Sequence, residues 1–157
     1  MADPSRAICK SRQTVANGLS SIFPMEEILK TARRIRRELS HLRGSWGQDL
    51  GGWCAVASGK LFEDLQEHHP RFVVVQQEAD PDIHHCFLQI GKWCLDITAR
   101  QFFHRLPTVW WCEEKSYYSF LRELGYMETV AVCKTREAIL FSMDGWDKRF
   151  KAFAELA

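Results

Sequence analysis

Cys54 is the residue whose surroundings in this sequence are best suited to covalent chemistry. It stands in the stretch WGQDLGGWCAVAS (46–58), behind two glycines and a tryptophan, with Gln48 six positions earlier. The pattern predicts a helix from Cys54 to about Leu65, and the unpaired N–H groups of a helix N-terminus lower the pKa of a thiol placed there. We therefore predict that Cys54 is a nucleophile. Its own N–H and the Gln48 side chain are the predicted donors to an oxyanion.

A thiolate nucleophile needs an imidazole partner, and the imidazole needs a group that orients it. The stretch HCFLQIGKWCLDIT predicts two strands joined by the two-residue turn Gly91-Lys92. Pairing about this turn places His85 diagonal to Asp96 on one face of the hairpin, within reach of a hydrogen bond. His84 competes for the role, but the same register points it to the other face. How close the thiol comes to the imidazole depends on the packing of the helix, which the register does not determine.

Three short motifs in this part of the chain resemble known families. GQDLGGWCAVAS resembles the active-site stretch of papain-like cysteine proteases, in which a glutamine precedes a cysteine at a helix start. HCFLQIGKWCLDIT resembles the His and Asp strands of transglutaminase-like enzymes. GGWC is similar to the Gly-Gly-x-Cys of arylamine N-acetyltransferases, and DITARQF to the end of the motif in small bacterial and phage proteins. The resemblance covers about residues 46–103. It implies a papain-like, transglutaminase-like core with Cys54, His85 and Asp96 as catalytic residues.

Departures from each family narrow the predicted chemistry to acyl transfer from a carboxamide. A papain-like protease has a second lobe, for which this chain has little room. An arylamine N-acetyltransferase is much longer and carries a lid that binds coenzyme A. The orienting residue here is Asp, where papain relatives have Asn. A single-lobed site should be shallow, which favours deamidation of a glutamine on a folded protein. A cysteine peptidase, isopeptidase or transglutaminase is the alternative, and a non-catalytic module that binds a protein in the same groove is a third hypothesis.

A zinc site is the competing use of the residues His84, His85, Cys86, Cys94 and Cys112. The sequence has no C-x-x-C or H-x-x-x-H spacing, and neighbouring strand residues point to opposite faces, so they cannot readily share an ion. We expect no metal and no cofactor. The six cysteines are scattered, and a set of disulfides is the weaker interpretation because no export signal precedes them.

The remaining patterns predict an α+β fold. Residues 23–44 form a predicted helix with one apolar stripe, and strand patterns occupy 71–78, 85–90, 93–98, 108–114 and 127–133. Further helices are expected at 117–124 and over 135–156, with a break near Gly145. We expect a loose arm at 1–20 and a single papain-like, transglutaminase-like domain over 21–157, in which N-terminal helices pack on a mostly antiparallel sheet.

The second face of the helix at 23–44 is basic, with Lys30, Arg33, Arg34, Arg36 and Arg37. We expect it to be solvated, and an acidic protein partner on Lys30, Arg33 and Arg37 is the sharper alternative. No aromatic residues alternate with these charges, so nucleic acid is not expected.

The whole chain gives no sign of a membrane or an export route. Its net charge is +1, no apolar run is long enough to cross a bilayer, and no signal-peptide pattern is present. The sequence therefore predicts a cytoplasmic protein, or one delivered to a host cell without a cleavable signal. A protein or peptide substrate is the predicted partner.

Overall fold

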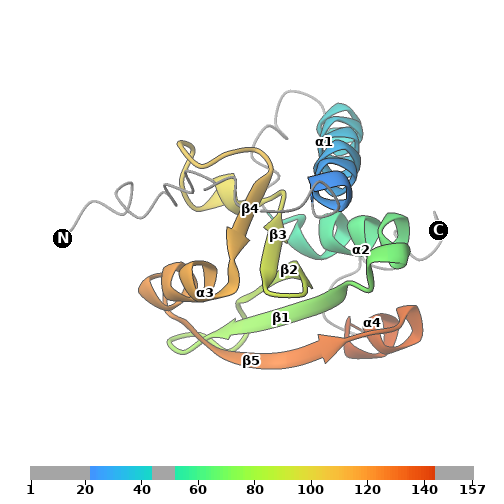
Figure 1. Ribbon diagram of the computed structural model, residues 1–157. Helices are drawn as coiled ribbons and strands as arrows, with labels where there is room; N and C mark the ends of the chain where they lie inside the picture. The colour runs from blue at the N-terminus through green and yellow to red at the C-terminus, as the bar shows by residue number, and fades with distance from the viewer. Residues whose placement is uncertain (1–21, 44–51, 144–157) are drawn as a thin grey trace.

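The computed structural model describes residues 22–43 and 52–143, which form an α+β fold. Figure 1 shows a five-stranded sheet in the order β4-β3-β2-β1-β5 with helices packed against it. Every neighbouring pair of strands in this sheet is antiparallel. The predicted fold class is confirmed at this level. The predicted arm at 1–20, and the part of the predicted C-terminal helix beyond Met143, lie outside the described residues.

The helices and strands follow the sequence pattern closely. The helices are α1 (Ile22–Arg43), α2 (Cys54–Asp64), α3 (Glu114–Glu123) and α4 (Arg136–Met143). The strands are β1 (Arg71–Gln77), β2 (His84–Ile90), β3 (Trp93–Asp96), β4 (Trp110–Glu113) and β5 (Tyr126–Cys133). Two short 3₁₀ turns, Gln66–His68 and Ala99–Gln101, are additional to the predicted elements. No helix in the described part is both long and apolar enough to cross a membrane.

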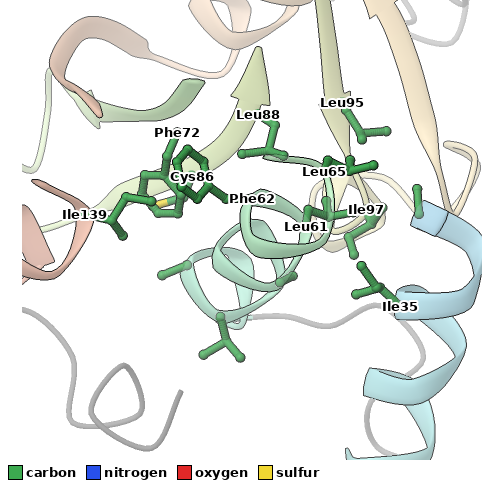
Figure 2. Packing of buried hydrophobic residues seen from close by; sticks show 14 of the residues in the cluster. Ile35, Leu61, Phe62, Leu65, Phe72, Cys86, Leu88, Leu95, Ile97 and Ile139 are labelled. Carbon is green, nitrogen blue, oxygen red and sulfur yellow. The ribbon is translucent and has the colours of Figure 1, made fainter. Parts of the chain in front are cut away.

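One face of the sheet packs against α1, α2 and α4. Figure 2 shows the side chains of α2 interleaved with those of the strands, among them Leu61, Phe62, Phe72, Cys86, Leu88 and Leu95. The predicted apolar stripe of α1 is buried in the same cluster, at Ile28, Ala32, Ile35 and Leu39. Burial of a large apolar side chain contributes ~1.5–3 kcal/mol. This packing therefore fixes α2, and with it Cys54, against β2.

The opposite face of the sheet carries a mainly aromatic cluster under α3. The rings of Phe87 and Tyr117 lie 4.6 Å apart between centroids, and those of Trp110 and Phe120 lie 4.8 Å apart. Aromatic pairs at such distances add about 0.5–1.5 kcal/mol beyond the burial of their surface. The cluster holds α3 firmly against the strands that carry the predicted His and Asp.

The β2–β3 hairpin has the predicted register. Gly91 takes a φ of 59° at the first turn position, in the left-handed region that glycine adopts without strain. Each pair of the ladder agrees with the prediction: Ile90 with Trp93, Gln89 with Cys94 and Leu88 with Leu95. The ladder ends there, because the chain leaves β3 after Asp96 and enters the second 3₁₀ turn. In the described structure, the first half of β2 consequently has no strand beside it on the β3 side.

The prediction that Arg36 lies on the solvated face of α1 is wrong. Its side chain is buried, and its guanidinium donates a hydrogen bond to the Ile97 carbonyl at 2.6 Å. The other basic residues of that face are exposed, as predicted. Arg36 thus anchors α1 to the residue that follows Asp96 at the end of β3.

Arg36→Met should lower the free energy of unfolding by about 2 kcal/mol, because a buried carbonyl loses a charged donor. Arg37→Met is the matched control: it removes the same group from the neighbouring, exposed position and should stay within about 0.5 kcal/mol of the wild type. Urea unfolding followed by tryptophan fluorescence measures both. Equal stability of the two variants would contradict the anchoring role of Arg36.

Candidate functional site

Cys54 is the first residue of α2, the position predicted from the sequence. Gly52 takes a φ of 73°, which a glycine tolerates, and Trp53 is the N-cap residue without a side-chain cap hydrogen bond. The first N–H groups of a helix have no carbonyl partner within it, so they favour an anion at this end. Cys54 is partly exposed, whereas the other described cysteines, Cys86, Cys94, Cys112 and Cys133, are buried. Of the described cysteines, Cys54 is therefore the one best placed to meet a substrate.

His85 and Asp96 form a buried pair. His85 Nε2 lies 2.8 Å from Asp96 Oδ2, and both residues are 1% exposed. The hydrogen bond predicted from the hairpin register is present. His84 is directed elsewhere, with its Nδ1 3.2 Å from the Asp82 carbonyl oxygen. Because Nε2 of His85 faces the carboxylate, Nδ1 is the ring nitrogen left for exchange of a proton with a nucleophile.

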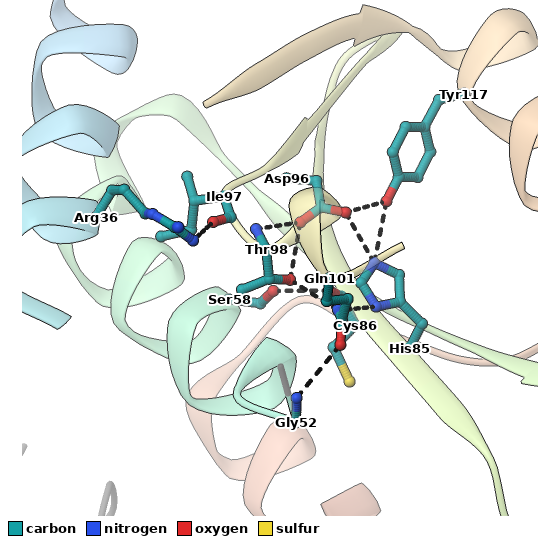
Figure 3. A network of polar contacts seen from close by, with 10 residues as sticks. All are labelled: Arg36, Gly52, Ser58, His85, Cys86, Asp96, Ile97, Thr98, Gln101 and Tyr117. Atoms are coloured by element: carbon teal, nitrogen blue, oxygen red, sulfur yellow. Dashed lines mark hydrogen bonds and ion pairs between the residues drawn. The ribbon is translucent and has the colours of Figure 1, made fainter. Parts of the chain in front are cut away.

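The Asp96 carboxylate accepts hydrogen bonds at both oxygens (Figure 3). The Tyr117 hydroxyl donates to Oδ2 at 2.7 Å, and it also lies 3.2 Å from His85 Nε2. Thr98 donates to Oδ1 twice, from its N–H at 2.7 Å and from its hydroxyl at 3.0 Å. Donors to a carboxylate stabilise its charged form and fix its orientation. Asp96 is therefore a rigid, ionised partner for the imidazole.

The pKa values of this group follow from its contacts. Burial alone would lower the pKa of His85, but the charge and hydrogen bond of Asp96, together with Cys54, raise it to about 10. Burial alone would raise the pKa of Asp96, and the charge and hydrogen bond of His85 more than reverse this, so the pKa is lowered. Burial, reinforced by the Asp96 charge, raises the pKa of Tyr117 well above its usual value. Tyr117 therefore stays protonated and donates.

The pKa of the Cys54 thiol lies well below its usual value. The largest cause is a hydrogen bond from the Cys86 thiol, which works against the effect of burial. A hydrogen bond with His85, the positive charge of His85 and the Cys86 N–H lower the pKa further. The pKa of Cys86, the donor, is raised well above its usual value. Since Ser58, one turn along α2, donates to the Cys86 carbonyl at 3.0 Å, α2 holds the Cys54 sulfur against this part of β2.

Gln101 fills the space between the start of α2 and His85 (Figure 3). Its Oε1 accepts a hydrogen bond from the Gly52 N–H at 3.3 Å. Its Nε2 lies 3.3 Å from His85 Nδ1 and donates to the Thr98 hydroxyl at 3.4 Å. A side-chain carboxamide of the protein itself thus lies against the imidazole.

The structure brings three of the four predicted site residues together, since Gln48 lies outside the described residues. Thr98, Gln101 and Tyr117 are site residues that the sequence analysis did not assign. The role of Thr98 could have been predicted from its spacing to Asp96, because an Asp commonly accepts a hydrogen bond from the backbone N–H two residues later. Gln101 belongs to the DITARQF motif, which suggested a family but no role for this side chain.

The residues that were weighed for zinc do not gather into one group. His85 stacks with Phe87 on the aromatic face of the sheet, while Cys86 belongs to the cluster on the other face. Among the residues that the structure describes, no three His, Cys, Asp or Glu side chains are arranged to hold a metal ion. The chemistry that the site can perform is that of a partly exposed, low-pKa thiol beside an oriented imidazole.

Comparisons of the chain with protein-family models, with curated proteins and with solved structures found no match. The residues and the geometry of the site are therefore the basis for proposing a function.

Cys54 should react with iodoacetamide at pH 6 much faster than Cys86 and Cys94. Alkylation requires the thiolate; the pKa of Cys54 is lowered, whereas the pKa values of the other two thiols are raised. Mass spectrometry of the tryptic peptides gives each rate. In concentrated urea the difference should disappear, because the contacts that shift the pKa values are lost. Equal labelling of the folded protein at pH 6 would rule out an activated Cys54.

His85→Ala should slow the alkylation of Cys54 at pH 6, because loss of the imidazolium charge and hydrogen bond raises the pKa of the thiol. His84→Ala is the matched control, since it removes the neighbouring histidine, and it should react like the wild type. Asp96→Asn should have an intermediate effect. If His84→Ala slows the reaction and His85→Ala does not, the imidazole of the site is that of His84.

Proposed function

We propose that the protein is a thiol-dependent acyl-transfer enzyme that acts on carboxamides, and that it deamidates glutamine side chains of proteins. The observation that carries this proposal is the position of Cys54 at the start of α2, beside the buried His85–Asp96 pair. Cysteine nucleophiles need a lowered pKa, an imidazole and a group that orients the imidazole. These three requirements are met by residues of three different elements.

The reaction begins with attack of the Cys54 thiolate on the carboxamide carbon. The carbonyl oxygen becomes an oxyanion, which accepts a hydrogen bond from the Cys54 N–H at the start of α2. His85 gives its Nδ1 proton to the nitrogen of the tetrahedral intermediate, ammonia leaves and a thioester remains. His85 then takes a proton from water, which attacks the thioester and releases a carboxylic acid and the thiolate. Asp96 holds Nε2 throughout and stabilises the imidazolium.

The finer fold that we propose is the papain-like, transglutaminase-like core. Support comes from the order of the parts: a helix that begins with the cysteine, then a strand with the histidine, then the adjacent antiparallel strand with the aspartate. Gln48 keeps its predicted role as the second oxyanion donor. The described residues form one sheet with helices packed against it, and we expect the site to open toward the surface of a folded substrate.

The exposed basic residues of α1 support an acidic protein as a partner or substrate. The exposed Lys30, Arg33 and Arg37 line a depression of about 350 Å³, together with the buried Arg36 and with Thr108 and Val109. Charge of one sign around a depression attracts groups of the opposite sign and speeds association. An acidic region beside the target glutamine would fit this surface.

Incubation of a cell lysate with the protein should convert specific glutamines to glutamates, and Cys54→Ala should abolish the conversion because no thioester can form. Proteome-wide mass spectrometry of the two samples identifies the sites. His85→Ala should reduce the rate by roughly a thousandfold or more, and Asp96→Asn by less. New N-termini or glutamine–lysine crosslinks in place of glutamates would assign peptide cleavage or transamidation instead. No difference between active protein and Cys54→Ala would contradict enzymatic activity on cellular proteins.

A further inference from the structure

The carboxamide of Gln101 lies between a backbone N–H just before α2 and the imidazole of His85. Its oxygen accepts a hydrogen bond from the backbone N–H of Gly52, two residues before the nucleophile. Its nitrogen lies 3.3 Å from His85 Nδ1, the ring atom that protonates the departing amine in the proposed reaction. Figure 3 shows the side chain reaching from the 3₁₀ turn to both groups. Oxygen toward backbone N–H groups and nitrogen toward the imidazole is the orientation that acyl transfer from an amide requires.

The position of Gln101 opposes the protonation of His85. The amide nitrogen can donate to Nδ1 only while Nδ1 carries no proton, because Nε2 already serves Asp96. An imidazolium has a proton on both ring nitrogens, so two donors would then face each other. Rotation of the carboxamide by half a turn does not help, because the NH₂ group would then face the Gly52 N–H. Protonation of His85 and occupancy by Gln101 therefore oppose each other.

The charged groups around His85 favour its protonated state, against the effect of Gln101. The titratable groups that face the imidazole are Cys54 of α2, Asp96 of β3, Tyr117 of α3 and Tyr126 of β5. Two of these, the thiolate and the carboxylate, are anionic when the site is charged, and the two phenols stay neutral because their pKa values are raised. Gln101 is half-buried and Gly52 is exposed. The side chain can consequently reach solvent without a rearrangement of the core.

We propose that the site contains a subsite for a primary carboxamide, which Gln101 occupies in the resting protein and vacates when a substrate glutamine enters. The inference rests on the proposed function and adds to it a substrate-binding subsite and an internal competitor. In this subsite the Gly52 N–H binds the oxygen of the amide. His85 Nδ1 and the Thr98 hydroxyl bind its NH₂ group. While Gln101 is in place, its NH₂ group opposes a proton on Nδ1 and so keeps the reactivity of Cys54 below that of an empty subsite.

Gln101→Ala tests this subsite through the reactivity of Cys54 toward methyl methanethiosulfonate, a thiol reagent without an amide. The rate at pH 6 should rise about two- to tenfold, the factor that corresponds to one net hydrogen bond. Gln101→Asn keeps the amide but withdraws it by one methylene, and it should behave similarly. Gln89→Ala removes a glutamine from the far end of β2 and should leave the rate unchanged. An unchanged or slower rate in both Gln101 variants, with melting temperatures like that of the wild type, would overturn the proposal.

Acetamide should restore the slow rate in Gln101→Ala, because it matches the group that the substitution removes. N,N-dimethylacetamide, which has no N–H, and acetate, which has no nitrogen, should protect Cys54 much less. Equal effects of all three would show that no carboxamide subsite exists. These readouts need no turnover. Protection by acetamide without any glutamine conversion in the lysate would uphold the subsite and refute the deamidase, and the reverse result would refute only the subsite.

Discussion

The early end of the β2–β3 ladder is the constraint on which the site depends. β3 pairs with β2 only from Leu88 to Ile90, so the Cys86 backbone has no strand partner on that side. A buried N–H or C=O without a partner costs about 1–3 kcal/mol. α2 supplies the missing partners, since Ser58 donates to the Cys86 carbonyl and the Cys54 thiolate accepts from the Cys86 N–H. Cys54 therefore lies beside His85 because its sulfur accepts the hydrogen bond of the neighbouring Cys86 N–H, which has no strand partner on the β3 side.

The early end of the β2–β3 ladder also allows Cys54, on the helix that covers one face of the sheet, to reach His85 on the other face. Cys54 packs with the cluster that α1 and α2 cover, whereas His85 contacts Phe87 and Tyr117 on the aromatic face. If β3 continued to pair along the first half of β2, its backbone would lie between the side chains of Cys54 and His85. Instead the chain turns away after Asp96, and its next residues are fixed from several directions. Tyr117 of α3 holds Asp96, and Arg36 of α1 holds Ile97. Helices on both faces thus position the end of β3, which preorganises the His85–Asp96 pair.

Local periodicity was sufficient to predict the hairpin, but not what surrounds it. Gly91 sets the turn, and the two-residue period of a strand then determines which side chains share a face, so the His85–Asp96 contact follows from the sequence. The approach of Cys54 to His85 depends on how α2 packs, and Tyr117 reaches Asp96 only because α3 covers that face of the sheet. Neither placement has a local pattern. Arg36 shows a different limit: helical spacing gives the direction of a side chain, but its long apolar stem can carry the charged group under a neighbouring segment.

A substrate that enters this site has to take over the contacts that the Gln101 carboxamide makes in the resting protein. When Gln101 leaves, the Gly52 N–H loses its acceptor and the Thr98 oxygen loses one donor, and a primary carboxamide restores both contacts. An ester or a carboxylic acid lacks the N–H donors, and a secondary amide such as a peptide bond has only one. Thr98 and His85 are buried, and a ligand that leaves such groups with fewer partners is disfavoured by more than the lost contact itself. Competition with the internal amide weakens all ligands by the same factor, so the discrimination comes from the contacts that only a primary carboxamide makes. The geometry around His85 thus favours glutamine side chains over main-chain peptide bonds for a reason that is independent of the depth of the cleft.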